Sequence, residues 1–450
     1  FRMLVLRQLR LCSPSCSRIP SAFSSSVASS SQLVESTPRY PRPLEFSADG
    51  ERYKTDDKWN ISMAVTQLMQ RRLLKEKFNP LSLIKQRIVN HMHKKYRKPG
   101  GRSPLFAVCD NEPRVVSIFD NFDSLLVPDD HVSRKPSDTY YVNAGHCLRA
   151  HTSAHQHKLM KQGLDAFLVF GDVYRRDEID KTHYPCFHQM EGVCLYSPDE
   201  LFHTRADEPL AILEREPTRR TPTKQERLTG DAVKALEIRL KATLEQLSDA
   251  LFGEGCEKRW VDAYFPFTHP SYELEVKYEG QWLEVLGCGI MEQQLLESAG
   301  AGDKVGWAFG LGLERLAMVL YGIPDIRLFW TLDSGFLSQF EGKSPEDNLK
   351  YVPISSHPQV IFDLSYWLPE GVQLDDMRAD VCDVIRSTGG ELVEQVKLTD
   401  EFIHPKTKRR SQTLRVVYRS HERALTKDEV NVVHRSIERE LVERYAVQLR

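Results

Sequence analysis

The stretch VFGDVYRRDEIDKTHYPCFHQMEG, residues 169–192, decides the fold of this chain. Its first six residues predict a buried strand that ends at Tyr174, and the charged residues 175–177 stop it. Extended character returns at residues 187–191. We therefore expect two antiparallel strands joined by a loop.

The returning strand places three chemically distinct side chains on one face. Phe187, Gln189 and Glu191 lie at alternate positions, and strand side chains alternate between faces. If Arg175 projects over the same floor, it adds a permanent planar cation. Such a surface suits an adenine ring, an α-phosphate and an ammonium group. A surface hairpin with incidental ion pairs is the alternative.

A second segment, GWAFGLGLERLAMVLYG at 306–322, predicts a glycine-rich strand that turns into a helix. The first turn of that helix holds Glu314 and Arg315, and an arginine there can hold a terminal phosphate bidentately. The glycines do not form the GxGxxG dinucleotide pattern, and the sequence contains no Walker lysine loop. A third segment, CLRAHTSAHQ at 147–156, is also dense in polar residues that packing alone does not explain.

Composition excludes several classes of protein. With 450 residues the chain is too long for one core, so two or more domains are expected. No run approaches eighteen uninterrupted apolar residues, which excludes a membrane-spanning helix. The nine cysteines show neither CxxC nor Cys/His ligand spacing, which argues against a zinc site or a disulfide framework. A net charge of −2 excludes a uniformly basic nucleic-acid binder but conceals local asymmetry.

The first 34 residues differ from the rest of the chain. They contain no Asp or Glu, carry four arginines and are rich in serine. This composition predicts a mitochondrial targeting presequence at 1–34, with a disordered tail as the alternative. An N-terminal extension follows at 35–74.

The body of the chain divides into two further parts. Apolar residues at helical spacing predict helices near 81–92, with a basic outer face, and 233–251. Residues 272–278 and 281–287 have strand character, and 204–230 is a polar, proline-containing insertion. We expect a catalytic domain at 75–335 and a linker at 336–355.

The tail, 356–450, has the pattern of a βαββαβ ferredoxin-like domain. Strands are predicted at 360–367, 391–399 and 411–419, with a helix near 375–388. A second helix opens with the capping box Thr426-x-x-Glu429. The tail also carries a basic strand face and loop that can follow a phosphate backbone, although a solvated sheet edge is the alternative. Its candidate RNA contacts are Lys406, Lys408, Arg409, Arg410, Arg415 and Arg419.

The chain resembles the phenylalanyl-tRNA synthetases, a family of class II aminoacyl-tRNA synthetases. The segments at 173–192 and 306–322 are similar to motifs 2 and 3 of that class. The surrounding segments NFDSLLVP, RAHTSAHQ, FPFTHPS and WLEVLGCG strengthen the resemblance. It covers about 75–335, and the tail resembles the anticodon-binding domain of the single-chain mitochondrial form. The implied fold class is α+β, with an antiparallel-sheet catalytic domain followed by the ferredoxin-like domain.

The resemblance also implies roles for individual residues. Arg175 would contact the ATP α-phosphate, Phe187 would stack on adenine, and Arg315 would hold the γ-phosphate. Ser153, His155, Gln156, Gln189 and Glu191 would bind the amino and carboxyl groups of phenylalanine, and Ala154 and Met190 are further implied substrate contacts. Phe265 and Phe267 would clasp the ring of the substrate, with Ala308 and Phe309 at its far end. Thr182, His183 and Tyr184 would lie on a loop that closes over the adenylate. Glu284 would help to place Mg²⁺, or contact the ribose instead.

The implied reaction is ATP-dependent activation of L-phenylalanine and transfer to the 2′-hydroxyl of the terminal adenosine of mitochondrial tRNA(Phe). The implied enzyme is a monomer of the mitochondrial matrix, without a membrane partner. His155 is a candidate general base, although a hydrogen-bonding role suffices. Departures at His269 and in MEQQ (291–294) leave roles at His269 and Glu292 open. A catalytically inactive, synthetase-like RNA-binding protein and a ligase for a different acceptor are the rival interpretations.

Overall fold

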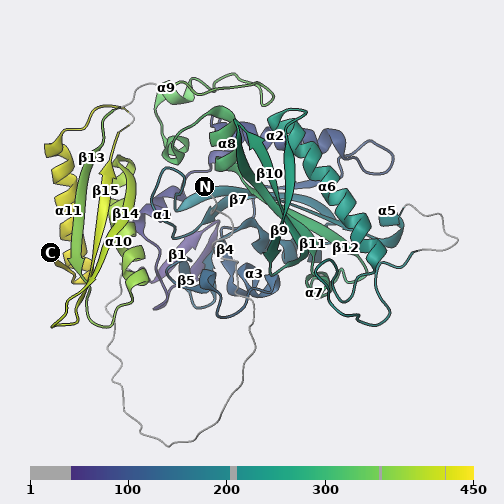
Figure 1. The fold of residues 1–450 in the computed structure, drawn as a ribbon, viewed down its shortest axis with the longest axis horizontal. Coiled ribbons are helices and arrows are strands. Elements are labelled where there is room, and N and C mark those ends of the chain that lie inside the picture. The colour runs from purple at the N-terminus through teal and green to yellow at the C-terminus, as the bar shows by residue number, and fades with distance from the viewer. Residues whose placement is uncertain (1–41, 203–209, 354–356, 421) are drawn as a thin grey trace, which may run out of the picture.

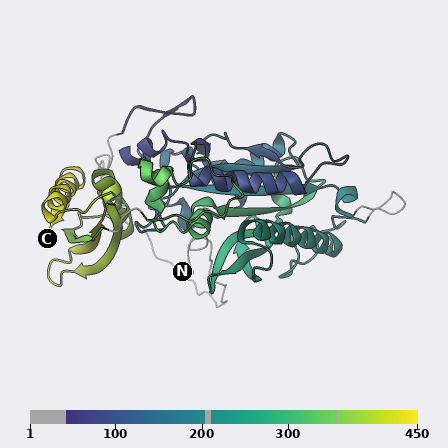
Figure 2. The same cartoon turned by 90° about the horizontal axis from the view of Figure 1, so that it is seen from above.

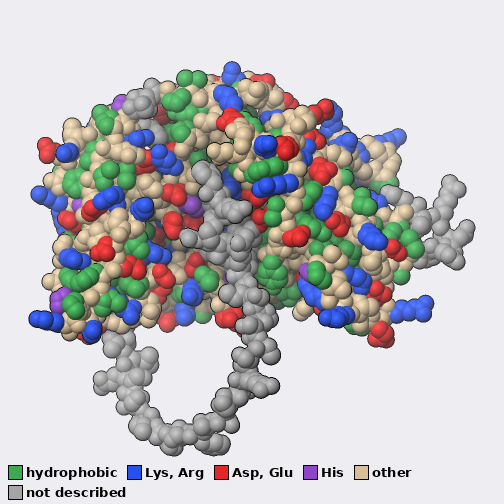
Figure 3. All heavy atoms as spheres, viewed as in Figure 1, with side chains coloured by type: hydrophobic (Ala, Val, Ile, Leu, Met, Phe, Trp, Pro, Cys, Tyr) green, Lys and Arg blue, Asp and Glu red, His purple; other side chains and the backbone are tan. Residues whose placement is uncertain are grey.

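The computed structural model describes residues 42–202, 210–353, 357–420 and 422–450, which form two bodies (Figure 1). The presequence predicted at 1–34 lies outside the described residues. Basic and acidic side chains are interspersed over the face of both bodies seen in Figure 3, as the balanced composition suggests. Within the described ranges, no helix combines the length and the apolar character needed to cross a membrane.

The larger body is built on a seven-stranded sheet with the order β3-β7-β8-β12-β11-β10-β9. Neighbours are antiparallel except β3, which runs parallel to β7. The strands are β3 (Ala107–Cys109), β7 (Ala166–Tyr174), β8 (Cys186–Tyr196), β9 (Lys258–Phe265), β10 (Thr268–Tyr278), β11 (Gln281–Met291) and β12 (Val305–Gly312). The antiparallel hairpin predicted from residues 169–192 is therefore confirmed, with Val173 opposite Phe187 and Val169 opposite Glu191.

Two long helices and one shorter helix cover one face of this sheet. They are α2 (Pro80–Lys95), α6 (Gly230–Phe252) and α8 (Leu313–Tyr321), and α2 and α6 lie side by side in Figure 2. Asn79 caps α2 by accepting a hydrogen bond from the backbone N–H of Leu81. The apolar row predicted for α2 is fully buried, which confirms its amphipathic character.

Shorter elements complete this body. The helices are α1 (Met63–Leu68), α3 (Ile118–Asn121), α4 (Gln156–Lys161), α5 (Pro198–Phe202), α7 (Gln293–Ser298) and α9 (Ser334–Leu337). Single 3-10 turns occur at Leu73–Lys75, Asp123–Leu125, Val132–Arg134, Thr152–His155 and Ile326–Trp330. A small sheet has the order β4-β6-β5, with β4 (Val115–Ser117), β5 (Tyr141–Asn143) and β6 (His146–Leu148). Between residues 210 and 229 the chain forms no helix or strand, only isolated bridges.

The described part of the N-terminal extension, residues 42–74, contacts the sheet body. It forms the hairpin β1 (Glu45–Ala48) and β2 (Glu51–Lys54). Asp49, in the turn, accepts hydrogen bonds from Arg114 and Arg72. Asn60 binds the backbone of Thr139 and Tyr141. The sequence alone indicated no structure for this segment.

The smaller body is the predicted βαββαβ domain. Its sheet has the order β14-β15-β13-β16, and its two helices pack against each other. The elements are β13 (Val360–Trp367), α10 (Leu374–Gly389), a 3-10 turn (Gly390–Leu392), β14 (Val393–Ile403), β15 (Arg410–Tyr418), α11 (Lys427–Tyr445) and β16 (Gln448–Leu449). The predicted capping box at the start of α11 is present, with Thr426 and Glu429 satisfying each other's backbone N–H groups.

The two bodies meet at the loop between β7 and β8. Arg176 on this loop forms ion pairs of 2.7 Å with Asp380 and 2.9 Å with Asp383, both on α10. Tyr140 donates a hydrogen bond to Asp383, and the N–H of Val396 donates to the carbonyl of Ile179. Figure 1 shows α10 on the side of its domain that faces the larger body. The C-terminal domain is therefore held by buried polar contacts as well as by its linker.

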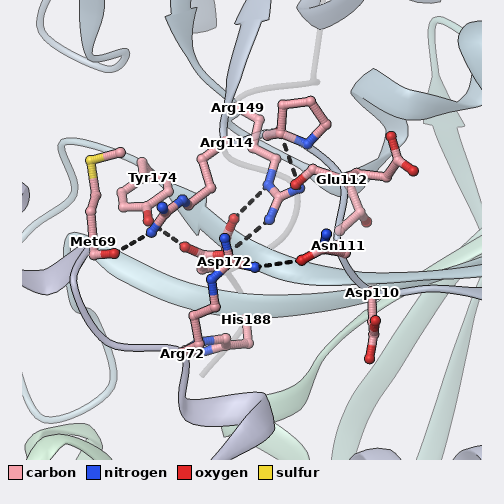
Figure 4. Close-up of polar contacts among 12 residues, drawn as sticks. Met69, Arg72, Asp110, Asn111, Glu112, Arg114, Arg149, Asp172, Tyr174 and His188 are labelled. Carbon is pink, nitrogen blue, oxygen red and sulfur yellow. Dashed lines mark hydrogen bonds and ion pairs between the residues drawn. The ribbon is translucent and has the colours of Figure 1, made fainter. Parts of the chain in front are cut away.

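A buried arginine organises the edge of the main sheet (Figure 4). Arg149 is 2% exposed and donates to the backbone carbonyl of Asp172 and, at 2.8 Å, to its carboxylate. Tyr174 donates to the same carboxylate. Although burial opposes the charge of Asp172, Arg149 keeps the pKa of that carboxyl below its ordinary value. The guanidinium lies directly against Gly171, where any Cβ would overlap it.

We predict that Gly171→Ala lowers the free energy of unfolding of the larger body by about 2–3 kcal/mol, because the new methyl group must displace a buried, fully hydrogen-bonded guanidinium. Gly230→Ala is the matched control, since a Cβ at Gly230 meets nothing within 4 Å. Urea unfolding of both variants measures the difference. Equal stability of the two would show that Arg149 moves aside without cost.

Candidate active site

A cavity of about 120 Å³ lies on the face of the main sheet opposite α2 and α6. Its floor comes from β8, β11 and β12, and its walls from the turn at 150–156 and the ends of β9 and β10. The cavity brings together residues from each of the polar segments that the sequence singled out. It is apolar at one end and lined by Arg175 at the other.

A buried carboxylate is the central polar group of the cavity. Glu191 is 3% exposed and accepts hydrogen bonds from the side chains of Ser153, Gln156 and Thr152. Burial raises its pKa to about 7, and the three hydrogen bonds only partly oppose that rise. A carboxylate of this kind is well suited to a ligand that brings its own positive charge.

Gln189, two residues away on the same strand face, lies beside Glu191. Its side-chain oxygen accepts a hydrogen bond of 3.3 Å from the N–H of Thr152. The side-chain oxygen of Gln156 is buried and finds no partner within the described residues. The cavity thus combines a carboxylate with amide groups that can bind an amino acid.

The apolar end of the cavity has two aromatic rings and a small floor. Phe265 and Phe267 lie with their ring centroids 5.9 Å apart and their planes 23° from parallel. Ala308 on β12 also lines the cavity, whereas the ring of the next residue, Phe309, packs on the opposite face of the sheet against Gly192. A planar hydrocarbon group of a ligand fits this end, because the rings of Phe265 and Phe267 and the methyl group of Ala308 are apolar.

Arg175 lines the cavity, whereas three predicted nucleotide contacts, Phe187, Glu284 and Arg315, lie outside its lining. The guanidinium of Arg175 lies 5.2 Å from the ring centroid of Phe187 and donates 2.8 Å to the carbonyl of Ala150. Arg315 on α8 lies 3.8 Å from the Glu284 carboxylate. Burial raises the pKa of Glu284, although Arg315 opposes the change. One nitrogen of Arg315 and one oxygen of Glu284 are buried without a hydrogen-bond partner in the described part of the chain, so the arginine can donate to a ligand and the oxygen can contact one.

A buried pair links the two motifs. Glu314, next to Arg315, accepts hydrogen bonds from the backbone N–H of His188 at 2.8 Å and from its Nδ1 at 2.6 Å. His188 lies between Phe187 and Gln189 in the chain. No sequence pattern predicted this contact. It fixes α8 relative to β8, and therefore Arg315 relative to Phe187.

The structure departs from the expectation for three of the predicted contacts. His155 lies outside the cavity, because Arg149 donates 2.9 Å to its Nε2, and burial and Arg149 together lower its pKa well below the ordinary value. Its Nε2 is therefore not free to take a proton from a substrate. Ala154 packs into the core below the turn. Met190 points to the opposite face of the sheet from Glu191, as strand alternation requires.

The loop residues Thr182, His183 and Tyr184 do not line this cavity either. Asp180 accepts hydrogen bonds from the first two, and its charge raises the pKa of His183 against the effect of burial. Tyr184 donates 2.8 Å to Glu391 of the C-terminal domain. In this arrangement the loop is held by the smaller body.

Two positions that were left open receive structural explanations. Glu292 forms an ion pair with Arg220, and His269 contacts the carbonyl of Thr221 at 2.7 Å. Both hold the 210–229 segment against the sheet. His151, which the sequence analysis did not select, lines the cavity instead. Burial and the charge of Arg175 lower its pKa to about 3, so the imidazole is neutral, and its buried Nδ1 has no partner among the described residues.

The basic residues of the tail fall into two groups. Lys406, Lys408, Arg409 and Arg410 lie on or beside the exposed loop between β14 and β15. Arg415 is paired with Asp363 at 2.9 Å, and Arg419 with the buried Glu394 at 3.1 Å. The loop therefore carries the more available positive charge.

The chain is similar to two protein-family models and to several known proteins. Residues 67–203 and 232–340 match the family "tRNA synthetases class II core domain (F)", and residues 355–450 match the "Ferredoxin-fold anticodon binding domain". Mitochondrial phenylalanine–tRNA ligase of Mus musculus is 50% identical over 95% of this chain and 93% of its own length. The probable mitochondrial phenylalanine–tRNA ligase of Drosophila melanogaster is 47% identical, over 94% and 95% respectively. The phenylalanine–tRNA ligase alpha subunit of a Synechocystis species is 34% identical over 54% of this chain and 69% of its own.

We predict that Glu191 makes the larger body less stable as the pH rises. Its pKa is about 7 in the folded state against 4.5 in its ordinary state, so the folded protein holds a proton that the unfolded chain has lost. Stability is therefore lost as the pH rises between these values, by about 2–3 kcal/mol from about pH 5 to about pH 8. The difference in unfolding free energy between the wild type and Glu191→Gln isolates this contribution. A pH-independent difference would contradict the raised pKa.

Proposed function

This chain belongs to the phenylalanine–tRNA ligases, and from that premise we propose how its residues activate L-phenylalanine with ATP and pass it to tRNA(Phe). The observation that carries the proposal is the buried Glu191, which lines the same cavity as the apolar residues Phe265, Phe267 and Ala308 and the cation Arg175. The alternative of a catalytically inactive RNA-binding relative finds no support in the comparisons.

The amino acid occupies the apolar end of the cavity. Its ammonium group binds the Glu191 carboxylate, with Gln189 and Ser153 beside it, and its ring lies against Phe265, Phe267 and Ala308. An ammonium next to Glu191 restores the charge that burial disfavours, so binding below about pH 7 releases the carboxyl proton. His151 replaces His155 as the histidine that faces the substrate, as a neutral hydrogen-bonding group.

ATP occupies the arginine end. Adenine stacks on Phe187, Arg175 contacts the α-phosphate, and Arg315 contacts the γ-phosphate. The carboxylate of phenylalanine then attacks the α-phosphorus in line, and pyrophosphate leaves. No enzyme nucleophile is needed, because the substrate carboxylate is itself the nucleophile. Arg175 stabilises the negative charge that develops in the transition state.

Mg²⁺ fits the same end. Within the described residues no cluster of three or more His, Cys, Asp or Glu side chains could enclose a metal ion. Mg²⁺ bound with nucleotides requires only one or two carboxylates and the phosphates themselves. Glu284 supplies a buried oxygen that has no hydrogen-bond partner among the described residues, and the charge of the neighbouring Glu275 helps to raise the pKa of Glu284. When bound there, Mg²⁺ would neutralise charge on the phosphates.

In the second step the 2′-hydroxyl of the terminal adenosine loses its proton and attacks the carbonyl carbon of the adenylate, the bond to the phosphate breaks, and AMP leaves. The ferredoxin-like domain, about 356–450, contacts tRNA, and the synthetase domain, about 75–335, performs both chemical steps. We place the enzyme in the mitochondrial matrix as a monomer. Support comes from the arginine- and serine-rich start of the chain and from relatives that are named mitochondrial and match almost its whole length.

The activity is tested by ATP–pyrophosphate exchange with each of the twenty amino acids, followed by charging of tRNA(Phe). We expect exchange with phenylalanine, and Glu191→Gln should lower kcat/KM for phenylalanine about 100-fold or more, because it removes one partner of a buried charge pair. Glu297→Gln, at an exposed ion pair with Arg227, is the control. Exchange with a different amino acid would reject the substrate, and wild-type rates in Glu191→Gln would reject the ammonium site.

Ala308 sets the discrimination against tyrosine. An apolar pocket rejects an added hydroxyl only about a hundredfold, since no buried protein group is left unpaired. Steric exclusion by the Ala308 methyl must supply the rest. Ala308→Gly should therefore raise kcat/KM for tyrosine relative to phenylalanine about tenfold, while Ala308→Val should impair both substrates. If the ratio is unchanged in Ala308→Gly, the residue serves strand packing only.

A further inference from the structure

Residues 210–229 form a segment that the proposed mechanism does not use. The segment contains no helix or strand, yet its two arms are hydrogen-bonded to each other. The N–H of Glu214 donates 2.8 Å to the carbonyl of Arg227, and at the tip the N–H of Thr221 donates 3.0 Å to the carbonyl of Lys224. The segment is therefore a defined structure that can hold other parts of the chain in place.

One side chain of this segment, Gln225, is buried against the main sheet and is 2% exposed. Its amide nitrogen donates 2.9 Å to the carbonyl of His269 and 2.8 Å to the carbonyl of Met291. Its amide oxygen accepts 2.9 Å from the backbone N–H of Gln293. Both amide hydrogens and the oxygen are thus in use, so this one side chain fixes three backbone groups relative to one another.

The three backbone groups lie next to the turn that carries Phe267. This turn connects β9 to β10, and Phe267 and the following Thr268 line the cavity. His269 follows Thr268 on β10, and Met291 is the residue of β11 that pairs with Thr268. Gln225 therefore contacts both strands at the base of the turn.

The strand pairing is irregular at this point. Between the pairs Thr268–Met291 and Ser271–Gly289, β10 has one residue more than β11, which is a β-bulge. A bulge interrupts the regular hydrogen bonds of the ladder, so backbone groups beside it need other partners. Gln225 supplies two donors and one acceptor where the ladder is interrupted.

A second contact connects the segment to the same turn. Glu292 forms an ion pair with Arg220, and the backbone N–H of Glu292 donates 3.0 Å to the carbonyl of Phe267. The side chain of Arg220 is 40% exposed, so water competes for this ion pair. Gln225 is buried, and its hydrogen bonds are therefore the stronger constraint on the turn.

We propose that Gln225 is a positioning residue for the amino acid, because through this turn it holds the Phe267 ring where the ring of phenylalanine binds. The inference rests on the proposed function, since it takes phenylalanine as the occupant of the cavity. Gln225 itself does not line the cavity. A wall that contacts the substrate equally before and during the reaction contributes to KM and not to kcat. Loss of the Gln225 hydrogen bonds therefore weakens the binding of phenylalanine alone.

The test is ATP–pyrophosphate exchange by the full chain. Gln225→Met keeps the length of the side chain and removes both donors and the acceptor. It should raise KM for phenylalanine about tenfold, because three buried backbone groups lose their partner. The values of kcat and of KM for ATP should stay within about twofold of the wild type. Gln225→Glu, which keeps the shape and the acceptor but loses the donors, is the second variant and should give the same result.

Gln412→Met is the matched control. Gln412 is also buried and hydrogen-bonded, to Tyr366 and Glu401, but it lies in the C-terminal domain. Its replacement should lower the melting temperature without changing KM for phenylalanine. A comparable rise in KM in Gln412→Met would show that loss of stability alone accounts for the effect, and would overturn the proposal.

A double-variant cycle tests whether Gln225 acts through Phe267. In a Phe267→Ala background the ring that Gln225 positions is absent, so Gln225→Met should change KM for phenylalanine by no more than about twofold. A tenfold rise in both backgrounds would overturn the proposal. So would an equal rise in KM for ATP, or an unchanged KM for phenylalanine in both Gln225→Met and Gln225→Glu. Absence of phenylalanine-dependent exchange in the wild type would instead reject the proposed function.

Discussion

The pairing of β7 with β8 is the constraint on which the site depends. Its register places Val169 opposite Glu191 and Gly171 opposite Gln189, so alternation sends Phe187, Gln189 and Glu191 to one face. The same alternation sends His188 and Met190 into the core beneath α2 and α8, where His188 meets Glu314. A shift of one residue would exchange the two sets. Chemistry and packing are therefore specified by one register, and neither can change alone.

The end of this hairpin is also where the two bodies join. Arg175 turns toward the cavity, while Arg176 forms ion pairs with two carboxylates of α10 that are each about 2% exposed. Charges this deeply buried are retained only when paired, because desolvation of either partner alone is costly. The two neighbouring arginines thus have different partners. Arg175 lines the cavity, and Arg176 fixes the position of the C-terminal domain.

Much of this arrangement could be predicted from local sequence patterns. Period-two and period-three-to-four patterns located the hairpin, the helices around Leu81 and Leu240, and the first five elements of the βαββαβ domain to within a few residues, whereas the closing strand was expected without bounds. The patterns failed where the deciding partner is distant in sequence. His155 was expected to face the substrate, but it contacts Arg149, and Arg149 is held in place by Asp172, which lies 23 positions further along the chain. The Glu314–His188 contact and the Asp49–Arg114 clamp join residues 126 and 65 positions apart, and no local periodicity signals such pairs.

The clamp of Glu314 on His188 has a consequence for how the site can vary. Arg315 and Phe187, the proposed contacts of the γ-phosphate and of adenine, lie on different elements, and hydrogen bonds between their chain neighbours Glu314 and His188 tie the two elements together. The distance between these two proposed nucleotide contacts is therefore set by the hydrogen bonds between Glu314 and His188, and neither of these residues lines the cavity. Side chains that face the amino acid can be exchanged to suit another substrate without disturbing that distance. Substitutions that change which amino acid is selected would therefore leave the distance between Arg315 and Phe187 unchanged. Selection of the amino acid and binding of the nucleotide can then vary independently, although both depend on the same sheet.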